Sequence, residues 1–320
     1  GVGILSLPSD IALIMGNDGW IGILLGGLIT IPFIIMIDKL FKLFPNRDFF
    51  QLGKEIIHPW TFKFLLIIFW FYSILLLSIS VRIFADIMKT YLLETTPTEI
   101  IIFTMLLATS YIARCQIETL ARMAVIIYPI IFAFVIFLLL ISIHSGDFTN
   151  IFPVFRLDWK SILKGISTVI FSYGGYEFSL LVLPMAENKD KTLKYNLKGI
   201  LIVIGIYLIV YFITLSQYGI YQLKREIWPT IALVKEVDLP GFFVENLDGI
   251  VLSIWIMAIY GSLGPVFHFS GVILGDLLNT KTHKIYILPL IPVIYTISLL
   301  PKNIVETDAI LWGVLKYFSI

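Results

Sequence analysis

Apolar runs of membrane-spanning length follow one another along the whole of this 320-residue chain. A helix needs about 20 mostly apolar residues to cross a bilayer, and about ten runs approach or exceed that length. They cover residues 1–16, 20–44, 63–90, 98–114, 122–143, 161–184, 197–219, 248–276, 284–300 and 308–320. Inside a bilayer each backbone polar group needs a partner within the protein, which favours α-helix in such runs. We therefore expect an all-α membrane protein with about ten transmembrane helices, forming one transmembrane domain over residues 1–320.

Composition excludes several other classes of protein. With 58% hydrophobic and 14% charged residues, the chain has too little charge to cover its apolar surface in water. Its net charge of +1 and its scattered basic residues give no nucleic-acid surface. The single cysteine, Cys115, excludes an intrachain disulfide and a multi-cysteine metal site. The sequence has no nucleophile elbow, Walker loop or zinc-spaced histidine pair, so we expect no enzyme activity, no cofactor and no metal.

The ends and loops of the chain carry further expectations. The chain begins inside an apolar motif without a methionine and ends within an apolar run, so we expect it to be truncated at both ends. Lysine-rich loops alternate with poorer ones, which places the start of the first span on the cytoplasmic side. Three outer loops weaken that contrast with their own lysines and arginines. In the longest of them, residues 220–247, we expect a short amphipathic helix.

Two of the apolar runs contain residues that break helices. The first opens with Gly1 and Gly3 and has Pro8 close behind, and the sixth contains Gly174-Gly175. Glycine lets the backbone unwind and a ligand approach, and proline removes an amide donor. Paired interrupted spans are typical of the substrate site of a transporter-type fold. We therefore expect discontinuous first and sixth spans that form one small-molecule pocket near the midplane; close helix packing through small residues is the alternative.

An acidic side chain lies inside the second of these breaks. Glu177 follows Gly174-Gly175 in an apolar run, where an ionisable residue is a functional-site hypothesis by default. Its carboxyl could pair with a ligand ammonium, take a proton, or accept backbone hydrogen bonds that order the break. A protonated structural carboxyl is the alternative. Tyr173 would share a helical face with Glu177 if the helix persisted.

Three polar positions in other spans have weaker functional interpretations. The spacing of Arg82 and Asp86 predicts an ion pair within one helix, which we interpret as structural. Tyr260 offers a hydroxyl near the middle of a span that Gly261, Gly264 and Pro265 would kink, and we expect it in the pocket. His268 lies near the end of the same span and is typical of a packed structural histidine.

Several segments together resemble a known family. They are GVGILSLPSDIALIMGNDGWIGILLGGL, RIFADIMKTYLLETTPTEII, the GGYE of the sixth span, WPTIALVKEVDLPGFFVENLD and SLLPKN. In this order they resemble the B-subunit family of bacterial spore germinant receptors, part of the amino acid–polyamine–organocation transporter superfamily. The resemblance covers essentially the whole chain.

The resemblance implies a permease-like fold and a place in a complex. The fold would have ten spans in two inverted five-helix repeats, with the first and sixth helices broken. The protein would reside in the inner membrane of a dormant spore, as a multi-pass bacterial membrane protein. Its partners would be a membrane A subunit and a C-subunit lipoprotein. The complex would sense nutrients such as amino acids, sugars or nucleosides and trigger germination.

The resemblance also implies which residues bind the nutrient. In related transporters the substrate lies between the broken first and sixth helices. Together with Tyr260, this gives the candidate ligand-binding residues Gly1, Val2, Gly3, Ile4, Leu5, Tyr173, Gly174, Gly175, Tyr176, Glu177 and Tyr260. Their apolar and aromatic character favours an uncharged or hydrophobic amino acid over a sugar. The alternatives to a sensor are a proton-coupled secondary amino acid transporter that uses Glu177, and a membrane scaffold with a vestigial pocket.

Overall fold

The structure is a computed structural model that describes residues 3–156, 158–236, 247–280, 282–304, 306–307 and 310. All regular structure in this part of the chain is helical. The chain divides into two compact units, one of Gly1–Asn46 with Pro129–Trp255 and one of Arg47–Tyr128 with Ile256–Ile320. Each unit is described by itself.

The first unit holds the start of the chain and the middle of the sequence. It contains α1 (Gly3–Met15), η1 (Gly16–Asp18), α2 (Gly19–Leu43), η2 (Phe148–Ile151), α7 (Trp159–Val169), η3 (Ile170–Tyr173), η4 (Tyr176–Phe178), α8 (Ser179–Val182), η5 (Leu183–Met185), α9 (Lys189–Leu223) and α10 (Pro229–Glu236). Two helices, α6 (Ile117–Ser145) and α11 (Leu247–Leu277), carry the chain from one unit to the other.

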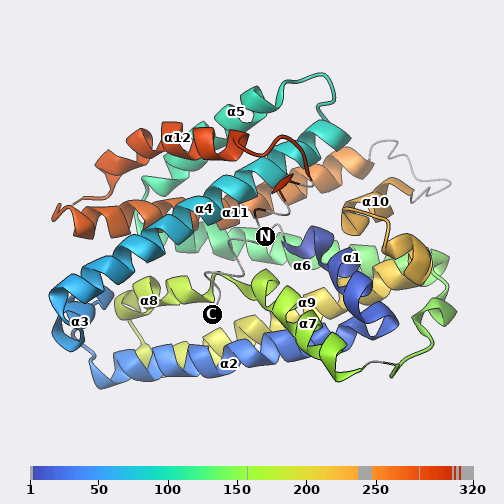
Figure 1. The fold of residues 1–320 in the computed structure, drawn as a ribbon, viewed down its shortest axis with the longest axis horizontal. Helices are drawn as coiled ribbons and strands as arrows, with labels where there is room; N and C mark the ends of the chain where they lie inside the picture. The colour runs from blue at the N-terminus through green and yellow to red at the C-terminus, as the bar shows by residue number, and fades with distance from the viewer. Residues whose placement is uncertain are drawn as a thin grey trace. The chain divides into compact units, whose positions relative to one another are not determined.

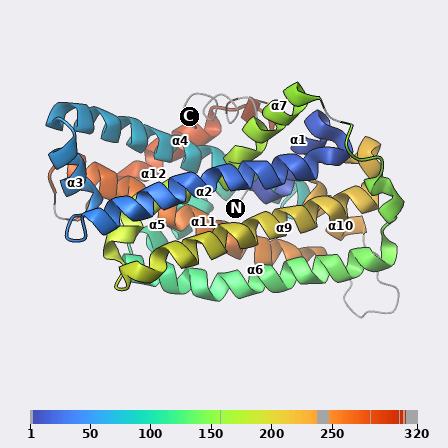
Figure 2. The same cartoon turned by 90° about the horizontal axis from the view of Figure 1, so that it is seen from below.

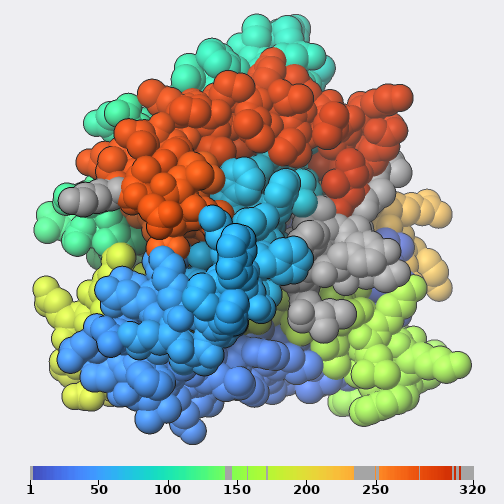
Figure 3. Space-filling view, turned by 60° about the vertical axis from the view of Figure 1, so that its left-hand side comes forward, coloured from blue at the N-terminus to red at the C-terminus, as the bar shows by residue number. Residues whose placement is uncertain are grey.

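The second unit is built on three long helices and one short one. Besides its parts of α6 and α11, it contains α3 (Phe49–Ile56), α4 (Pro59–Tyr91), α5 (Thr98–Ala113) and α12 (Lys284–Leu299). Figure 3 shows the side chains of α12, in orange-red, packed beside those of α4, in light blue. Asp48 begins α3 with a capping box. Its carboxylate accepts the backbone N–H of Gln51, and the side-chain oxygen of Gln51 accepts the backbone N–H of Asp48.

The expected all-α membrane protein is confirmed. Within the described residues, five stretches are long and apolar enough to span a membrane: Gly3–Leu43, Pro59–Tyr91, Ile117–Leu140, Lys189–Leu223 and Leu252–Leu277. The first of these comprises α1 and α2, and shorter apolar helices cover Thr98–Ala113, Tyr176–Met185 and Lys284–Leu299. Each predicted run from residues 1–16 to 284–300 contains helix, and α10 is the expected short helix of the long loop. The predicted run at 308–320 lies outside the described residues, except Ile310. The inverted repeats stay a prediction.

The close pairing of α2 and α9 is the framework of the first unit. The two helices run alongside each other in both Figure 1 and Figure 2. Gly27 of α2 makes this approach possible, since a Cβ there would lie 2.4 Å from Ile204 of α9. At the neighbouring position, a Cβ on Gly26 would lie 3.2 Å from Val169, the last residue of α7. A glycine pair in α2 therefore lets α9 and the sixth apolar run pack against one helix.

A buried carboxylate fixes the loop that leads into α7. Asp18, which follows α1, is 2% exposed and accepts the backbone N–H groups of Phe155 and Arg156 at 2.6 and 2.8 Å. Asp158 then begins α7 by accepting the N–H of Ser161. Hydrogen bonds from the side chain of Ser161 first and from its N–H second lower the pKa of the Asp158 carboxyl. The start of the sixth run is thus held to the end of the first.

Candidate functional site

The sixth apolar run is interrupted in its middle. The α-helix α7 ends at Val169, a 3-10 turn follows to Tyr173, and α-helix returns only at Ser179. Between the two, Gly175 has φ of +109° and ψ of −17°. Residues with a side chain rarely adopt this backbone conformation, whereas glycine adopts it freely. The predicted break near Gly174-Gly175 is confirmed.

The backbone groups freed by the break are bonded in part by the protein itself. The carbonyl of Ser172 accepts a hydrogen bond from the hydroxyl of Tyr207, at 2.8 Å. The N–H of Gly175 donates to Oε2 of Glu177 at 2.8 Å, and the carbonyl of Gly175 accepts from the N–H of Phe178 at 3.3 Å. Because unbonded backbone groups are expensive away from water, these contacts stabilise the broken conformation.

The contact of Glu177 matches one of the roles considered for its carboxyl, that of ordering the break. The half-buried side chain turns back to the N–H of Gly175, two residues earlier. The helix does not persist here, so the condition under which Tyr173 and Glu177 would share a helical face is not met. Tyr173 is instead 4% exposed and donates its hydroxyl to the carbonyl of Ile23 in α2, at 2.8 Å.

The first span is helical from the edge of its predicted break. From Gly3 to Met15 the backbone is one α-helix with Pro8 inside it, so of the break predicted near Gly1–Gly3 only Gly3 is described, and it begins the helix. Gly1 and Val2, the rest of this predicted break and part of the predicted ligand site, lie outside the described residues. Pro8 has no N–H to offer the carbonyl of Ile4. The hydroxyl of Thr230, in α10, donates to that carbonyl at 2.9 Å.

The two glycine motifs nevertheless lie together. A Cβ on Gly3 would be 3.1 Å from Oγ and 3.2 Å from Cβ of Ser172. The amino end of α1 therefore lies against the last 3-10 turn before the break. Helix amino ends carry unbonded N–H groups and partial positive charge, which favours polar or anionic groups nearby.

A cavity of about 310 Å³ lies beside the break in the first unit. Residues of α2, of the break and of α9 line it: Ile34, Ser172, Tyr173, Gly174, Tyr176, Ser179, Asn196, Ile200, Val203 and Tyr207. Three of the predicted ligand residues, Tyr173, Gly174 and Tyr176, are among them. Gly175 and Glu177 are at the break but do not line this cavity. The rings of Tyr173 and Tyr207 pack together, with centroids 5.2 Å apart.

Two polar residues of the cavity were not anticipated from the sequence. Oγ of Ser179 and Nδ2 of Asn196 are buried and have no hydrogen-bond partner within the described part of the chain. Each such atom costs about 1–3 kcal/mol. Asn196 lies just before the apolar run predicted at 197–219. The prediction begins that run after Asn196 because the preceding lysines resemble a loop, whereas α9 begins already at Lys189. The one sequence signal for this position was an amide side chain next to an apolar run.

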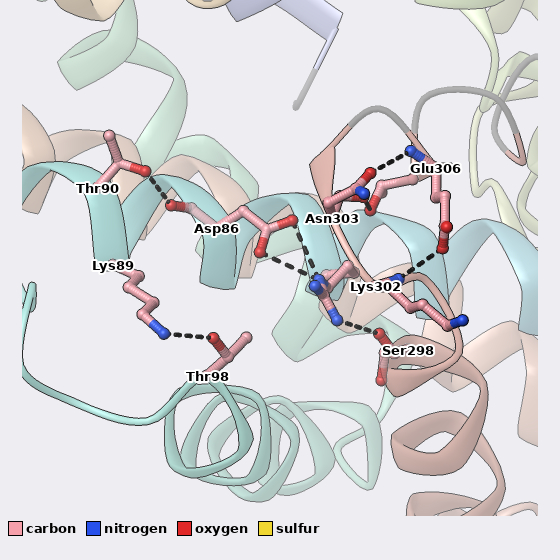
Figure 4. A network of polar contacts seen from close by, with 10 residues as sticks. Asp86, Lys89, Thr90, Thr98, Ser298, Lys302, Asn303 and Glu306 are labelled. Atoms are coloured by element: carbon pink, nitrogen blue, oxygen red, sulfur yellow. Dashed lines mark hydrogen bonds and ion pairs between the residues drawn. The ribbon is translucent and has the colours of Figure 1, made fainter.

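The predicted ion pair of α4 is confirmed in the second unit. Nε of Arg82 lies 3.1 Å from both carboxylate oxygens of Asp86, and both side chains are buried. Nη1 of Arg82 also donates to the carbonyl of Ser298 at 3.3 Å, which ties α4 to the end of α12. Figure 4 shows this network together with the contact of Lys89 to Thr98. Its contacts hold helices to one another, in keeping with the structural interpretation.

The other two sequence candidates also belong to the second unit. His268 is 5% exposed, with Nδ1 3.0 Å from the carbonyl of Ala113 and its ring 4.2 Å from that of His283. It is packed, as expected. Tyr260 lies half-buried on α11, and its place in the ligand site stays a prediction.

Comparison with known proteins assigns the family. The family model described as "Spore germination protein" matches residues 1–307. The chain belongs to the spore germination protein family. The chain is 26% identical to spore germination protein YndE of Bacillus subtilis (strain 168), over 97% of this chain and 85% of that one. It is 27% identical to spore germination protein GerLB of Bacillus cereus, over 95% and 82% of the two chains.

A third relative matches slightly less of the chain. Spore germination protein A2 of Bacillus subtilis (strain 168) is 28% identical over 90% of this chain and 80% of its own length. The resemblance drawn from the sequence is thereby confirmed for the family. Its family and its long apolar helices together make the chain a multi-pass membrane protein.

Proposed function

We propose that this chain is the nutrient-sensing subunit of a spore germinant receptor in the inner spore membrane. A small nutrient such as an amino acid binds at the break in the sixth run. It favours one of two conformations of the subunit because it binds that conformation more tightly. The change is passed to a membrane A subunit and a C-subunit lipoprotein, and germination follows. No catalytic step is part of the proposal.

One observation carries the proposal. The break at Gly174-Gly175, the amino end of α1 at Gly3 and a cavity of about 310 Å³ lie together in one unit. Irregular backbone at membrane depth is tolerated where it is buried in protein or lines a cavity. Tyr173 and Gly174 line the cavity, so the irregular backbone here borders a space that a small molecule could occupy.

Spores without the gene test the sensing role. We expect them to lose the germination response to at least one nutrient within a panel of amino acids, sugars and nucleosides, and to recover it with the wild-type gene. An affinity tag on the protein should recover the A and C subunits from spore membranes. Unchanged responses to the whole panel would contradict the proposal.

A working proton-coupled amino acid transporter is the second candidate. Glu177 favours it, because this half-buried carboxyl sits within the break and could carry a proton. The test is uptake of labelled amino acids by proteoliposomes that contain the purified protein. Uptake that follows an imposed pH gradient and fails in Glu177→Gln would assign transport. A sensor would bind the amino acid without moving it into the vesicles.

A further inference from the structure

The amino end of α9 lies beside the carboxyl end of α2 (Figure 2). Two lysines at this place are bonded within the protein. Lys189 donates to the carbonyl of Pro45, and Nζ of Lys42 lies 2.8 Å from Oδ2 of Asp38. The hydroxyl of Thr192 donates to Asp38 as well, so these contacts hold the two helix ends together.

Three further lysines of α9 have a different environment. Lys191, Lys194 and Lys198 are exposed, and none of them forms an ion pair with a described residue. At about 100° per residue, the three positions fall within an arc of about 60° on one side of the helix. They extend over about 10 Å along its axis. These three residues, the lysine face, therefore present their ammonium groups close together.

The lysine face is on the opposite side of α9 from the nutrient cavity. Asn196, Ile200, Val203 and Tyr207 of α9 line that cavity, at intervals of three and four residues. Their mean direction lies about 180° around the helix axis from that of the three lysines. The cavity therefore does not explain the lysine face.

The length of α9 places the lysine face at the level of the lipid headgroups. From Lys189 to the residue before Gly219, where the backbone leaves helical φ/ψ, the helix is about 45 Å long. The hydrocarbon core of a bilayer is about 30 Å thick, so the ends of such a helix extend into the headgroups. Tyr195, 62% exposed at the edge of the lysine face, is a residue type enriched at that level.

The same side of the helix becomes apolar where the lysines end. Leu201 and Ile202 follow on this side and are 54% and 36% exposed. A charged patch followed directly by an exposed apolar one matches a lipid, whose headgroup is polar and whose chains are not. An acidic segment of a partner protein would match the lysines but not the leucine and isoleucine beyond them.

The positive-inside rule explains only part of this arrangement. The rule accounts for lysines near the end of a span, but it depends on their number and not on the side of the helix that carries them. Residues 187–198 contain four lysines and two acidic residues, Glu187 and Asp190, which leaves a charge of +2. Three of the four lysines share one narrow arc, and topology alone does not require that.

We propose that the lysine face of α9 binds the phosphate headgroup of an anionic lipid, with the acyl chains along Leu201 and Ile202. Juxtamembrane lysines attract anionic lipids, and each ammonium group has three N–H donors for phosphate oxygens. Three such groups within one arc direct that attraction to one place. This inference goes beyond the proposed function, and neither depends on the other.

Paired substitutions test the inference. Lys194→Gln with Lys198→Gln removes two of the three charges and keeps polar side chains. Lys160→Gln with Lys164→Gln is the matched control, since these lysines of α7 are also exposed, four residues apart and without an ion pair to any described residue. Lys194→Arg with Lys198→Arg is a second control that keeps the charge. The Gln variant and the α7 control lose the same net charge.

The measurement compares two lipids with the same acyl chains, anionic phosphatidylglycerol and zwitterionic phosphatidylcholine. Native mass spectrometry of the full-length purified protein in nonionic detergent gives the apparent Kd of the first bound lipid. Wild type should prefer phosphatidylglycerol. Because each lysine near an anionic headgroup contributes about fivefold, this preference should fall at least tenfold in Lys194→Gln/Lys198→Gln. It should change less than about twofold in both controls.

Four results would overturn the inference. An unchanged preference in Lys194→Gln/Lys198→Gln would mean that the lipid binds elsewhere. An equal fall in the α7 control would mean that only net charge matters. Displacement of the lipid by inorganic phosphate at the same concentration would make the lysine face an anion site without a lipid. Loss of the A subunit from affinity-tagged Lys194→Gln/Lys198→Gln, with lipid preference intact, would assign the lysine face to a protein partner.

Discussion

Gly175→Ala isolates the backbone conformation of the break. Among the described residues no atom lies within 4 Å of a Cβ at this position, so the methyl group meets none of them. The cost arises from φ of +109°, which lies outside the small left-handed region open to other residues. Such strain costs about 1–3 kcal/mol, and this φ argues for about 2–3 kcal/mol. Alanine also stiffens the unfolded chain, which returns about 0.4–1 kcal/mol. The net destabilisation of the broken conformation is therefore about 1–2.5 kcal/mol.

The assay is unfolding of the purified protein in detergent, followed by tryptophan fluorescence. Gly199→Ala is the control. Gly199 lies within the helix α9 and has no positive φ, and no described atom lies within 4 Å of a Cβ there either. In helix, alanine is favoured over glycine by about 1 kcal/mol, so the control should be stabilised. The two variants should therefore move in opposite directions. In spores, Gly175→Ala should weaken the nutrient response, and Gly175→Leu should abolish it while the protein remains in the membrane.

Equal stability of Gly175→Ala and Gly199→Ala would refute the reasoning, since it would mean that the break carries no backbone strain. Loss of Gly175→Leu from the membrane would show that this glycine serves folding. If Leu abolishes the response and Ala leaves it unchanged, the space beside Gly175 matters and its conformation does not.

Two further substitutions test contacts of the site. Glu177→Gln keeps an oxygen that can accept the N–H of Gly175, so we expect the nutrient concentration for half-maximal germination to change less than about tenfold, roughly 1.4 kcal/mol. A shift of several hundredfold would instead mean that the charge or proton of this carboxyl is needed, as loss of a buried charge partner costs about 3–5 kcal/mol. Thr230→Val removes the donor to the carbonyl of Ile4 and should lower stability by about 1 kcal/mol in detergent unfolding. Thr214→Val is its control, because among the described residues that hydroxyl bonds carbonyls of its own helix, and an equal effect would show that the contact to α1 contributes no more than a bond within one helix.

The helices and the second break could be predicted because their signals are local. Runs of about 20 apolar residues admit little besides helix in a bilayer. Gly174-Gly175 stands inside such a run, and glycine there lowers the barrier to a break. Sequence alone did not reveal that, of these two glycines, Gly175 is the one with a positive φ, nor that Glu177 bonds its N–H.

The first helix continues through Pro8 because a distant contact offsets the local signal. Pro8 deprives the carbonyl of Ile4 of its usual helical donor, which favours unwinding. Thr230, 226 residues away, supplies the missing hydrogen bond, and the helix continues from Gly3. No pattern around Pro8 could reveal this. Ser179 and Asn196 were missed for a related reason, since only the packing of α9 beside the break brings them to one cavity.

The strain at Gly175 and ligand binding in the cavity should both change the free energy of the broken conformation. A ligand that binds only the broken conformation stabilises it by RT ln(1 + [L]/Kd), about 2.7 kcal/mol at 100 times Kd. This equals or exceeds the 1–2.5 kcal/mol expected for Gly175→Ala, so saturating ligand should restore that variant to near wild-type stability. Failure to rescue Gly175→Ala would mean that the ligand binds both conformations equally, and a ligand of that kind could not signal.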